Sequence, residues 1–236
     1  MAGRQAQPID WGKMLLPKKE NMQFARDHGS APQHYYSAIL GYFYRQKLEM
    51  LCDFLPANKQ EKVLEVGYGS GICLKELSGR FHEVHGIDIH DLEPLVKQML
   101  ERERVFHVKL HQHDIFSNPV SFQSNFDCVI SSSVFEHIQL QLIEKGVRHV
   151  YDCLKPGGVF LIGFPLKTAL MNSLFKLYEL TYKRFNKMYD FQLEHDHPSG
   201  QKEIIPALER WFRIEEQRYF INSVFKLYTV LKCRKS

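Results

Sequence analysis

Residues 63–71 read Val-Leu-Glu-Val-Gly-Tyr-Gly-Ser-Gly, an apolar run that leads into a turn with glycines at alternate positions. The run predicts a buried β-strand that a single acidic residue, Glu65, interrupts. Glycine has no Cβ and tolerates positive φ angles, so a ligand can lie directly against the backbone of such a turn. In an α/β sheet the turn lies at the carboxyl end of a strand, where ligands bind. The segment therefore predicts an α/β fold with a nucleotide-like ligand at residues 67–71.

Strand and helix patterns alternate from residue 58 onward. The predicted strands are Lys62–Val66, Glu83–Ile87, Val105–Leu110, Phe126–Ser131 and Val159–Phe164, and the helices between them include Gly71–Leu77, Asp91–Arg104 and Leu140–Leu154. This alternation predicts a mostly parallel sheet with helices on both faces. Two later β-rich runs, Arg213–Tyr219 and Val224–Leu231, are joined through Asn222 and Ser223 and predict an antiparallel hairpin at the sheet edge.

Two segments do not follow the alternation. Residues 1–57 predict an N-terminal arm and a cap helix from about Tyr35 to Leu55 that ends at Pro56, before a main domain of residues 58–236. An insertion at about residues 166–200 has no strand pattern and mixes apolar, aromatic and basic residues at helical spacing. It predicts a lid helix packed on the domain. The alternative is contact with a lipid or membrane surface through residues 170–191.

Composition limits the classes of function. The net charge of +4 is spread along the chain, and no RNA-binding module is apparent, so nucleic acid is not expected as a partner. The five cysteines form no C-x-x-C pair, which argues against a disulfide framework or a zinc knuckle. No leader-like or membrane-spanning apolar run is found, so a cytoplasmic location is expected. The oligomeric state is not indicated.

Glycine spacing separates two classes of cofactor. The dinucleotide fingerprint, G-x-G-x-x-G, requires a third glycine where this chain has Ile72. The order found here, an acidic residue followed by G-x-G-x-G, instead resembles the first motif of the class I S-adenosylmethionine-dependent methyltransferases. The resemblance covers about residues 60–165 and includes the Leu-Lys-Pro-Gly-Gly turn at residues 154–158. It implies a Rossmann-like sheet of seven strands with S-adenosylmethionine as the cofactor.

The same resemblance implies roles for individual residues. Asp88, at the end of the second strand, would accept hydrogen bonds from the ribose hydroxyls, with Ile89 beside it. Asp114 would pair with the adenine amino group while Ile115 packs on the ring, and Ser131 would lie against the methionine part. The full implied set is Glu65, Gly67, Tyr68, Gly69, Gly71, Asp88, Ile89, Asp114, Ile115 and Ser131.

The methyl acceptor is addressed by the fourth-strand motif and by the insertion. The run from Ser131 to Val134 lacks the prolines typical of enzymes that methylate amino groups of DNA bases, so a small-molecule acceptor and O-methylation are favoured. His137, His195 and His197 are candidates for the general base because a near-neutral pKa suits proton removal. No metal is expected. Two alternatives stay open: a lipid-linked or membrane-associated substrate, and a non-catalytic subunit that binds S-adenosylmethionine.

Aromatic residues suggest where the acceptor binds. The insertion is rich in tyrosine and phenylalanine, and the cap helix could close an apolar pocket from the opposite side with Tyr35, Tyr36, Tyr42 and Phe43. Ser199 is the expected N-cap of a helix over Gln201–Trp211.

Overall fold

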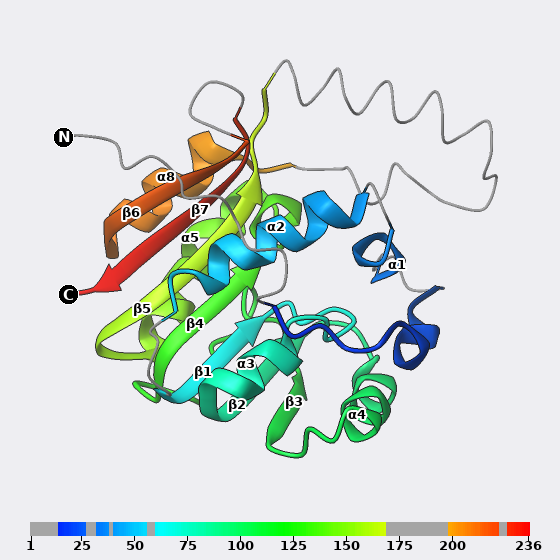
Figure 1. The fold of residues 1–236 in the computed structure, drawn as a ribbon. Coiled ribbons are helices and arrows are strands. Elements are labelled where there is room, and N and C mark those ends of the chain that lie inside the picture. The colour runs from blue at the N-terminus through cyan, green and yellow to red at the C-terminus, as the bar shows by residue number, and fades with distance from the viewer. Residues whose placement is uncertain (1–13, 27–31, 38–39, 56–59, 169–197, 222–225) are drawn as a thin grey trace.

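A computed structural model describes residues 14–26, 32–37, 40–55, 60–168, 198–221 and 226–236, and a single seven-stranded sheet organises them (Figure 1). The strand order is β3-β2-β1-β4-β5-β7-β6. The first five strands are parallel: β1 (Gln60–Val66), β2 (Phe81–Asp88), β3 (Val108–Gln112), β4 (Phe126–Ser132) and β5 (Leu154–Pro165). The last two, β6 (Phe212–Ile221) and β7 (Lys226–Lys235), are antiparallel, with β7 between β5 and β6. The predicted fold class is confirmed.

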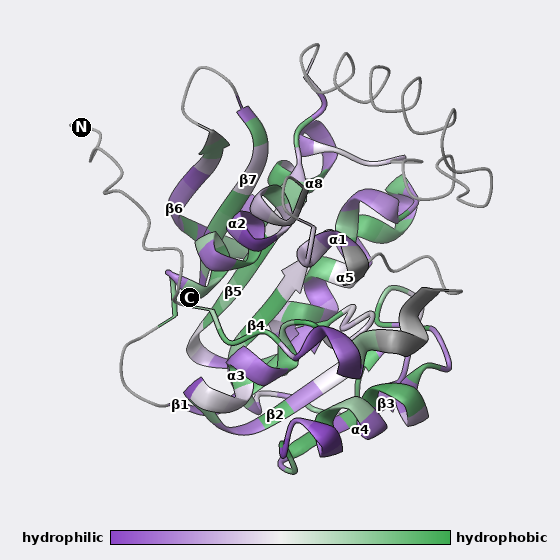
Figure 2. Ribbon diagram, turned by 45° about the vertical axis from the view of Figure 1, so that its right-hand side comes forward, coloured by the Kyte–Doolittle hydropathy of each residue, from purple (hydrophilic) through white to green (hydrophobic). Residues whose placement is uncertain are grey.

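Helices cover both faces of the sheet. On one face lie α2 (Leu40–Cys52), α3 (Leu74–Arg80) and α4 (Glu93–Arg102), and on the other α5 (Leu140–Cys153) and α8 (Gln201–Glu209). Successive strand residues point to opposite faces, so Val63 joins the core under α2–α4 while Leu64 joins the core under α5 and α8. Figure 2 shows the apolar residues gathered on the central strands and on the inner sides of the helices. Burial on both faces explains the nearly continuous apolar strands in the sequence.

Several predicted boundaries move for identifiable reasons. The strand predicted from Val105 begins at Val108, where pairing with Val84 of β2 starts. The helix predicted from Gly71 begins at Leu74, because the glycine turn continues to that point. The cap helix begins at Leu40 and ends at Cys52, preceded by the short helix α1 (Pro32–Tyr35).

Ser199 is not the N-cap of the last helix. That position belongs to Gly200, whose N–H donates to Glu203 at 2.9 Å, and the helix ends at Glu209. Ser199 is fully buried instead, and its hydroxyl donates to the carbonyl of Ile138. The prediction was wrong because this serine joins two distant segments rather than closing its own helix.

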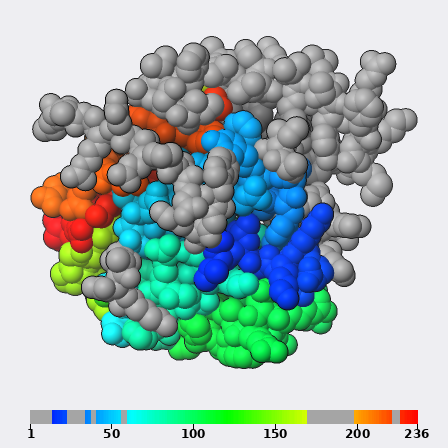
Figure 3. Space-filling model, in the orientation of Figure 1, coloured from blue at the N-terminus to red at the C-terminus, as the bar shows by residue number. Residues whose placement is uncertain are grey.

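Residues 14–26, which precede α1, cross the face of the domain that α3 and α4 cover. They include the 3-10 helix η1 (Lys19–Arg26) and lie over α3 and α4 (Figure 3, dark blue). The N–H of Leu15 donates to Glu76 at 2.7 Å, and the N–H of Lys18 and the amide of Asn21 both donate to Glu103 at 2.6 Å. The carboxylates of α3 and of the loop after α4 therefore hold the arm in place.

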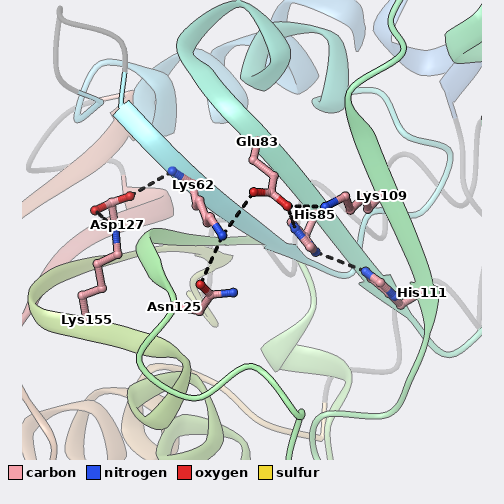
Figure 4. A network of polar contacts seen from close by, with 8 residues as sticks. All are labelled: Lys62, Glu83, His85, Lys109, His111, Asn125, Asp127 and Lys155. Atoms are coloured by element: carbon pink, nitrogen blue, oxygen red, sulfur yellow. Dashed lines mark hydrogen bonds and ion pairs between the residues drawn. The ribbon is translucent and has the colours of Figure 1, made fainter.

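A polar network ties the strands together (Figure 4). Asp127 accepts from the N–H of Lys62 at 2.9 Å and from Lys155 at 2.7 Å. Further along, Glu83 pairs with His85 at 2.9 Å, and His85 faces His111 at 3.2 Å between their ring nitrogens. Asp127 lies at the amino-terminal end of β4, where Lys155 also borders a surface pocket of about 350 Å³. Asp127 and Lys155 lie away from the glycine turn, so we assign the network a structural role.

Residues 169–197 of the predicted lid, which include 170–191, lie outside the described residues, as do Asn222 and Ser223 of the predicted hairpin turn. Among the helices that the structure describes, none combines the length and the apolar composition needed to cross a membrane.

Candidate functional site

The glycine turn follows β1 at the carboxyl edge of the sheet, and all three glycines have positive φ: +76° at Gly67, +50° at Gly69 and +75° at Gly71. The space around the three glycines differs. A Cβ on Gly67 would lie 2.3 Å from Val134, and one on Gly71 would lie 2.7 Å from Val96. A Cβ on Gly69 would meet nothing within 4 Å. Packing therefore demands glycine at the two ends of the turn, while the middle glycine faces open space.

Glu65 is the second-last residue of β1, just before the glycines, and is 5 % exposed. Its Oε2 has no hydrogen-bond partner among the described residues. Burial, and then the charge of Asp88, raise the pKa of this carboxyl well above its usual range. A buried carboxyl oxygen without a partner is costly, so it indicates a group that the structure does not contain.

Tyr68 is buried although it lies inside the turn. Its ring packs on Gly86 of β2, where a Cβ would approach it within 2.8 Å, and it meets the ring of His90 edge-on at 5.2 Å. Its hydroxyl has no partner among the described residues. Tyr68 therefore anchors the turn to β2 and presents one unsatisfied polar atom.

Asp88 ends β2 and holds the glycine turn. Its Oδ2 accepts from the N–H of Gly69 at 2.9 Å and its Oδ1 accepts from the N–H of Ile89 at 2.8 Å. A carboxylate offers about four lone-pair positions, so Asp88 can still accept from a ligand hydroxyl. Ile89 beside it is 67 % exposed, which is unusual for an isoleucine and suits an apolar ring placed on it.

Asp114 and Ile115 follow β3 on the same edge. Asp114 accepts from the N–H groups of Phe116 at 2.9 Å and Ser117 at 3.3 Å and from the Ser117 hydroxyl, so its carboxylate shapes its own turn. These hydrogen bonds lower its pKa although burial acts in the opposite direction. Ile115 is only 2 % exposed and packs in the core near α5. Ile115, the predicted apolar neighbour of the adenine, is thus hardly accessible, whereas Ile89 beside Asp88 is exposed.

The end of β4 brings hydroxyl groups to the other side of the turn. Ser131 is fully buried and donates to the carbonyl of Val66 at 3.2 Å, which ties β4 to β1 just before the glycines. The hydroxyls of Ser132 and Ser133 lie 3.1 and 3.2 Å from that of Tyr228. Tyr228 reaches this edge because β7 is antiparallel and begins beside Pro165, where β5 ends.

Glu136 completes this group of side chains. It lies on the short 3-10 helix η2 (Phe135–His137), is 1 % exposed, and its Oε2 has no partner among the described residues. Burial raises its pKa to about 8, while Lys47 and the Ser133 hydroxyl act in the opposite direction. We call Ser132, Ser133, Glu136 and Tyr228 the tyrosine–glutamate cluster.

His137, the neighbouring candidate base, is exposed on the same turn. The two other candidates, His195 and His197, lie outside the described residues. Within the described ranges no group of three or more His, Cys, Asp or Glu side chains is arranged to hold a metal ion.

The N-terminal helices face this cluster with a different set of aromatic residues from the one expected. The ring of Tyr35 meets that of Tyr44 edge-on at 5.2 Å, and the ammonium of Lys47 lies 4.4 Å from the Tyr44 ring and 5.2 Å from the Tyr228 ring. Burial raises the pKa of Tyr35, and Tyr44, Tyr228, Cys73 and Glu65 add to the effect.

The other aromatic residues expected at this place lie elsewhere. Tyr36 donates to the carbonyl of Pro17 at 2.6 Å, and the rings of Tyr42 and Phe43 pack on Phe220 of β6. Tyr42 and Phe43 belong to α2, which begins at Leu40, and a role of these three residues in an acceptor pocket stays a prediction.

Comparison with known proteins identifies the family. A family model described as "Methyltransferase domain" matches residues 34–213, which is most of the chain. The chain belongs to the class I S-adenosylmethionine-dependent methyltransferases. The predicted family and cofactor are thereby confirmed.

Individual relatives of this methyltransferase are distant. The carboxy-S-adenosyl-L-methionine synthase of Nautilia profundicola is 25% identical over 192 residues, which cover 80% of this chain and 73% of that protein. Among solved structures, the PH0226 protein of Pyrococcus horikoshii OT3 has a TM-score of 0.65 at 19% identity and covers 86% of this chain and 95% of its own. The N-methyltransferase NodS of Bradyrhizobium japonicum WM9, in complex with S-adenosyl-L-homocysteine, has a TM-score of 0.60 at 17% identity and covers 82% and 87%.

The carboxyl edge of this methyltransferase fits its cofactor. The open space above Gly69, the remaining acceptor capacity of Asp88 and the exposed side chain of Ile89 suit the adenosyl part. The unpartnered oxygen of Glu65 suits a cationic or hydrogen-bonding group beyond the turn. These assignments use only residues of β1, β2 and the turns that follow them, and they leave the tyrosine–glutamate cluster unassigned.

Sequence reasoning missed Tyr44, Lys47 and Tyr228. One signal for Tyr228 was available, because an antiparallel strand paired to the last parallel strand must begin at the carboxyl edge of the sheet. For Tyr44 and Lys47 the helical pattern of residues 40–52 did not reveal which face lies over the site.

Proposed function

We propose that this methyltransferase transfers the methyl group of S-adenosylmethionine to an oxygen of a small-molecule acceptor. The observation that carries the proposal is the tyrosine–glutamate cluster, which brings three hydroxyl groups and a buried carboxyl beside the glycine turn. Val134, which begins the η2 turn, contacts Gly67 directly. The cluster thus adjoins the cofactor turn but is not needed to hold the turn itself.

The composition of the cluster favours a hydroxyl-bearing acceptor. Hydroxyl groups both donate and accept, so Ser132, Ser133 and Tyr228 can exchange hydrogen bonds with an acceptor hydroxyl and fix its orientation. The rings of Tyr35 and Tyr44 supply an apolar wall from the N-terminal side. Together they suit a compact acceptor that carries a ring or an alkyl body and one reactive hydroxyl.

The main task of the protein in methyl transfer is to orient the acceptor relative to the methyl group. When bound, the cofactor supplies a methyl group on a sulfonium, which is already activated for displacement. The protein must hold the acceptor oxygen in line with that carbon, and alignment of this kind is worth about 7–11 kcal/mol in favourable cases. Contacts from β4, β7 and α2, three elements distant in sequence, are suited to fixing one orientation.

The proposal includes the cellular location and the partners of the protein. All five cysteines are buried free thiols, which supports a reducing, cytoplasmic location. We propose no nucleic-acid partner. Lipid contact through residues 170–191 is carried forward as an outcome of the experiment.

The test is methyl transfer from S-adenosylmethionine with a labelled methyl group to phenols and alcohols, to amines and to carboxylates, each analysed by mass spectrometry. Transfer to the hydroxyl panel is expected. Tyr228→Phe should lower the rate by about tenfold, the effect of one lost hydrogen bond of about 1.4 kcal/mol. Tyr219→Phe, on β6 and outside the cluster, is the matched control and should retain the rate.

Other outcomes of this experiment identify the alternatives. Products from amines only would contradict the oxygen acceptor. Binding of S-adenosylhomocysteine without transfer to any panel would indicate a non-catalytic subunit, and transfer that requires added phosphatidylglycerol vesicles would indicate a membrane-associated substrate. Formation of carboxy-S-adenosylmethionine would show that the chain shares the activity for which its Nautilia relative is named.

A further inference from the structure

We propose that Glu136 is the catalytic residue that takes the proton from the acceptor hydroxyl, in place of a histidine. The inference rests on the proposed function, since a hydroxyl acceptor has a proton to lose. It concerns the acceptor side of the site, where the sequence predicted histidines as candidate bases.

The position of Glu136 is the first argument. The η2 turn begins at Val134, in contact with Gly67, so Glu136 lies two residues from a side chain that touches the cofactor turn. Its side chain points inward to Ser133 and Tyr228, not to solvent. The site of proton removal is therefore next to the site where the methyl donor binds.

The second argument is that one oxygen of this carboxyl is unused. Oε2 has no hydrogen-bond partner among the described residues, although the side chain is 1 % exposed. Buried carboxyl oxygens are almost always hydrogen-bonded, because leaving one without a partner costs stability. Glu65 and Tyr68, the residues on the cofactor side, each present such an atom as well. The parallel indicates that Glu136 awaits a ligand on the acceptor side.

The third argument is that the surrounding fold holds Glu136 in place. Its carbonyl accepts from the N–H of Ser199 at 3.2 Å, and the Ser199 hydroxyl donates to the carbonyl of Ile138. Ser199 is fully buried and immediately precedes α8. The η2 turn is thus held by Gly67 at its start and by Ser199 at its end. A general base must be held in place, because its oxygen has to lie within hydrogen-bond reach of the proton that it removes.

The charge environment suits a base that works near neutral pH. Burial raises the pKa of Glu136 to about 8, against the effect of Lys47 on α2 and of the Ser133 hydroxyl. Tyr228 on β7 is the other titratable group facing it among the described residues, and burial raises the pKa of that phenol, so it stays neutral. A base is most effective when its pKa is near the working pH.

The candidate His137 and the histidines of the β2–β3 pair are placed less well. His137 is exposed on the same turn, and His85 and His111 form the stacked pair between β2 and β3 with ring centroids 5.4 Å apart. The step itself balances with Glu136 as base. The acceptor O–H bond breaks and an Oε2–H bond forms, the freed electron pair makes the new oxygen–carbon bond, and the pair of the broken carbon–sulfur bond stays on sulfur.

The first test is infrared titration of the protein saturated with S-adenosylhomocysteine. A protonated-carboxyl band that loses intensity as the pH rises through about 8 is expected in the wild type, and the part of this change that belongs to Glu136 should be missing in Glu136→Gln. Glu65 also contributes to this band, so the difference between the two proteins isolates Glu136. Glu144→Gln, an exposed residue of α5, is the control and should match the wild type. Absence of the titrating band would overturn the proposal whether or not an acceptor is known.

The second test is the pH dependence of kcat/KM with the hydroxyl acceptor that reacts fastest in the panel. The wild-type rate should rise with pH through about 8 and then level, because the carboxylate is the active form. Glu136→Gln should be at least about 100-fold slower and should lack that rise, as expected when a general base is removed. Its affinity for S-adenosylhomocysteine should be unchanged, which shows that the fold and cofactor side are intact.

The outcomes separate the two proposals. Glu136→Gln with the wild-type rate and pH profile would overturn the assignment of the base but leave O-methylation standing, as would a rise that depends on His137 instead. Methyl transfer to amines only would overturn the oxygen acceptor while the infrared titration of Glu136 could still be observed.

Discussion

Alanine substitutions at Gly69 and Gly71 should separate cofactor binding from stability. Both glycines have positive φ, so alanine at either position should cost about 1–2 kcal/mol of the free energy of unfolding, the usual penalty for an L-residue in the left-handed region. The neighbours of the added Cβ differ. At Gly69 there is none within 4 Å, whereas at Gly71 the Cβ would lie 2.7 Å from Val96 and 3.0 Å from Met99, both fully buried.

The added crowding sets the size of the difference. Inserting a methyl group into a packed core typically costs about 1–3 kcal/mol. Gly71→Ala should therefore lose about 2–5 kcal/mol in total, against about 1–2 for Gly69→Ala. In a domain of this length the extra loss corresponds to a melting temperature lower by about 2–12 °C. The affinity should change in the opposite order, because only the Cβ at Gly69 projects into the space where the cofactor fits.

Two measurements check this prediction. Urea unfolding of both variants gives the stability difference, and calorimetric titration with S-adenosylhomocysteine at a temperature where both are folded gives the affinity. Gly69→Ala should bind at least about tenfold more weakly, or about 1.4 kcal/mol, and Gly71→Ala should lose less. Equal stability of the two variants, or wild-type affinity of Gly69→Ala for S-adenosylhomocysteine, would refute the inference that Gly69 faces the cofactor and Gly71 faces the core.

Three further predictions concern the edge and the network. Asp88→Ala removes a carboxylate that accepts charge-assisted hydrogen bonds worth about 1.5–3 kcal/mol each, so titration should show binding of S-adenosylhomocysteine weaker by about 10–100-fold. Gly163→Ala would place a Cβ 2.6 Å from the hydroxyl of Tyr228 and should lower methyl transfer while cofactor affinity is retained, as kinetics and titration together would show. Stability should fall in mild acid. Burial lowers the pKa of His85 below its unfolded value of about 6.5, so its contribution is present above that pH and is lost as the pH falls through the folded value. Hydrogen bonds, that from Lys109 foremost, lower the pKa of Glu83 to about 2, so its contribution is lost between about pH 4.5 and 2.

Each of these has a contrary result. Wild-type affinity in Asp88→Ala would remove that residue from the cofactor site. An unaffected rate in Gly163→Ala would mean that the Tyr228 hydroxyl need not hold its position. For the polar network, the urea midpoint of the wild type should fall between pH 7 and 5, and it should fall less in His85→Gln. An equal dependence of the midpoint on pH in the two proteins would mean that other groups cause the loss of stability.

Local sequence was sufficient to predict the glycine turn and the position of Asp88 beside it. Gly67, Gly69 and Gly71 define their own turn, because positive φ at alternate residues is a property that glycine permits and few other residues do. Asp88 could be located because each parallel strand ends at the same edge, so strand order alone brings it beside Gly69. Boundaries were less accurate, since the start of β3 depends on where its neighbour begins to pair.

The acceptor half could be recognised only after folding. Glu136 and His137 are adjacent in sequence, where only the histidine was predicted as a candidate base. Only the packing of η2 against Gly67 and Ser199 shows that the first is buried and the second exposed.

The amino-acid sequence by itself determined the α/β class, the methyltransferase family and the cofactor, because those depend on short segments whose residues act on their neighbours. The tertiary structure alone decided which side chains gather where we propose that the acceptor binds. Lys47, Glu136 and Tyr228 come from α2, η2 and β7, and they meet only when the antiparallel β7 pairs with β5 and α2 packs across the sheet.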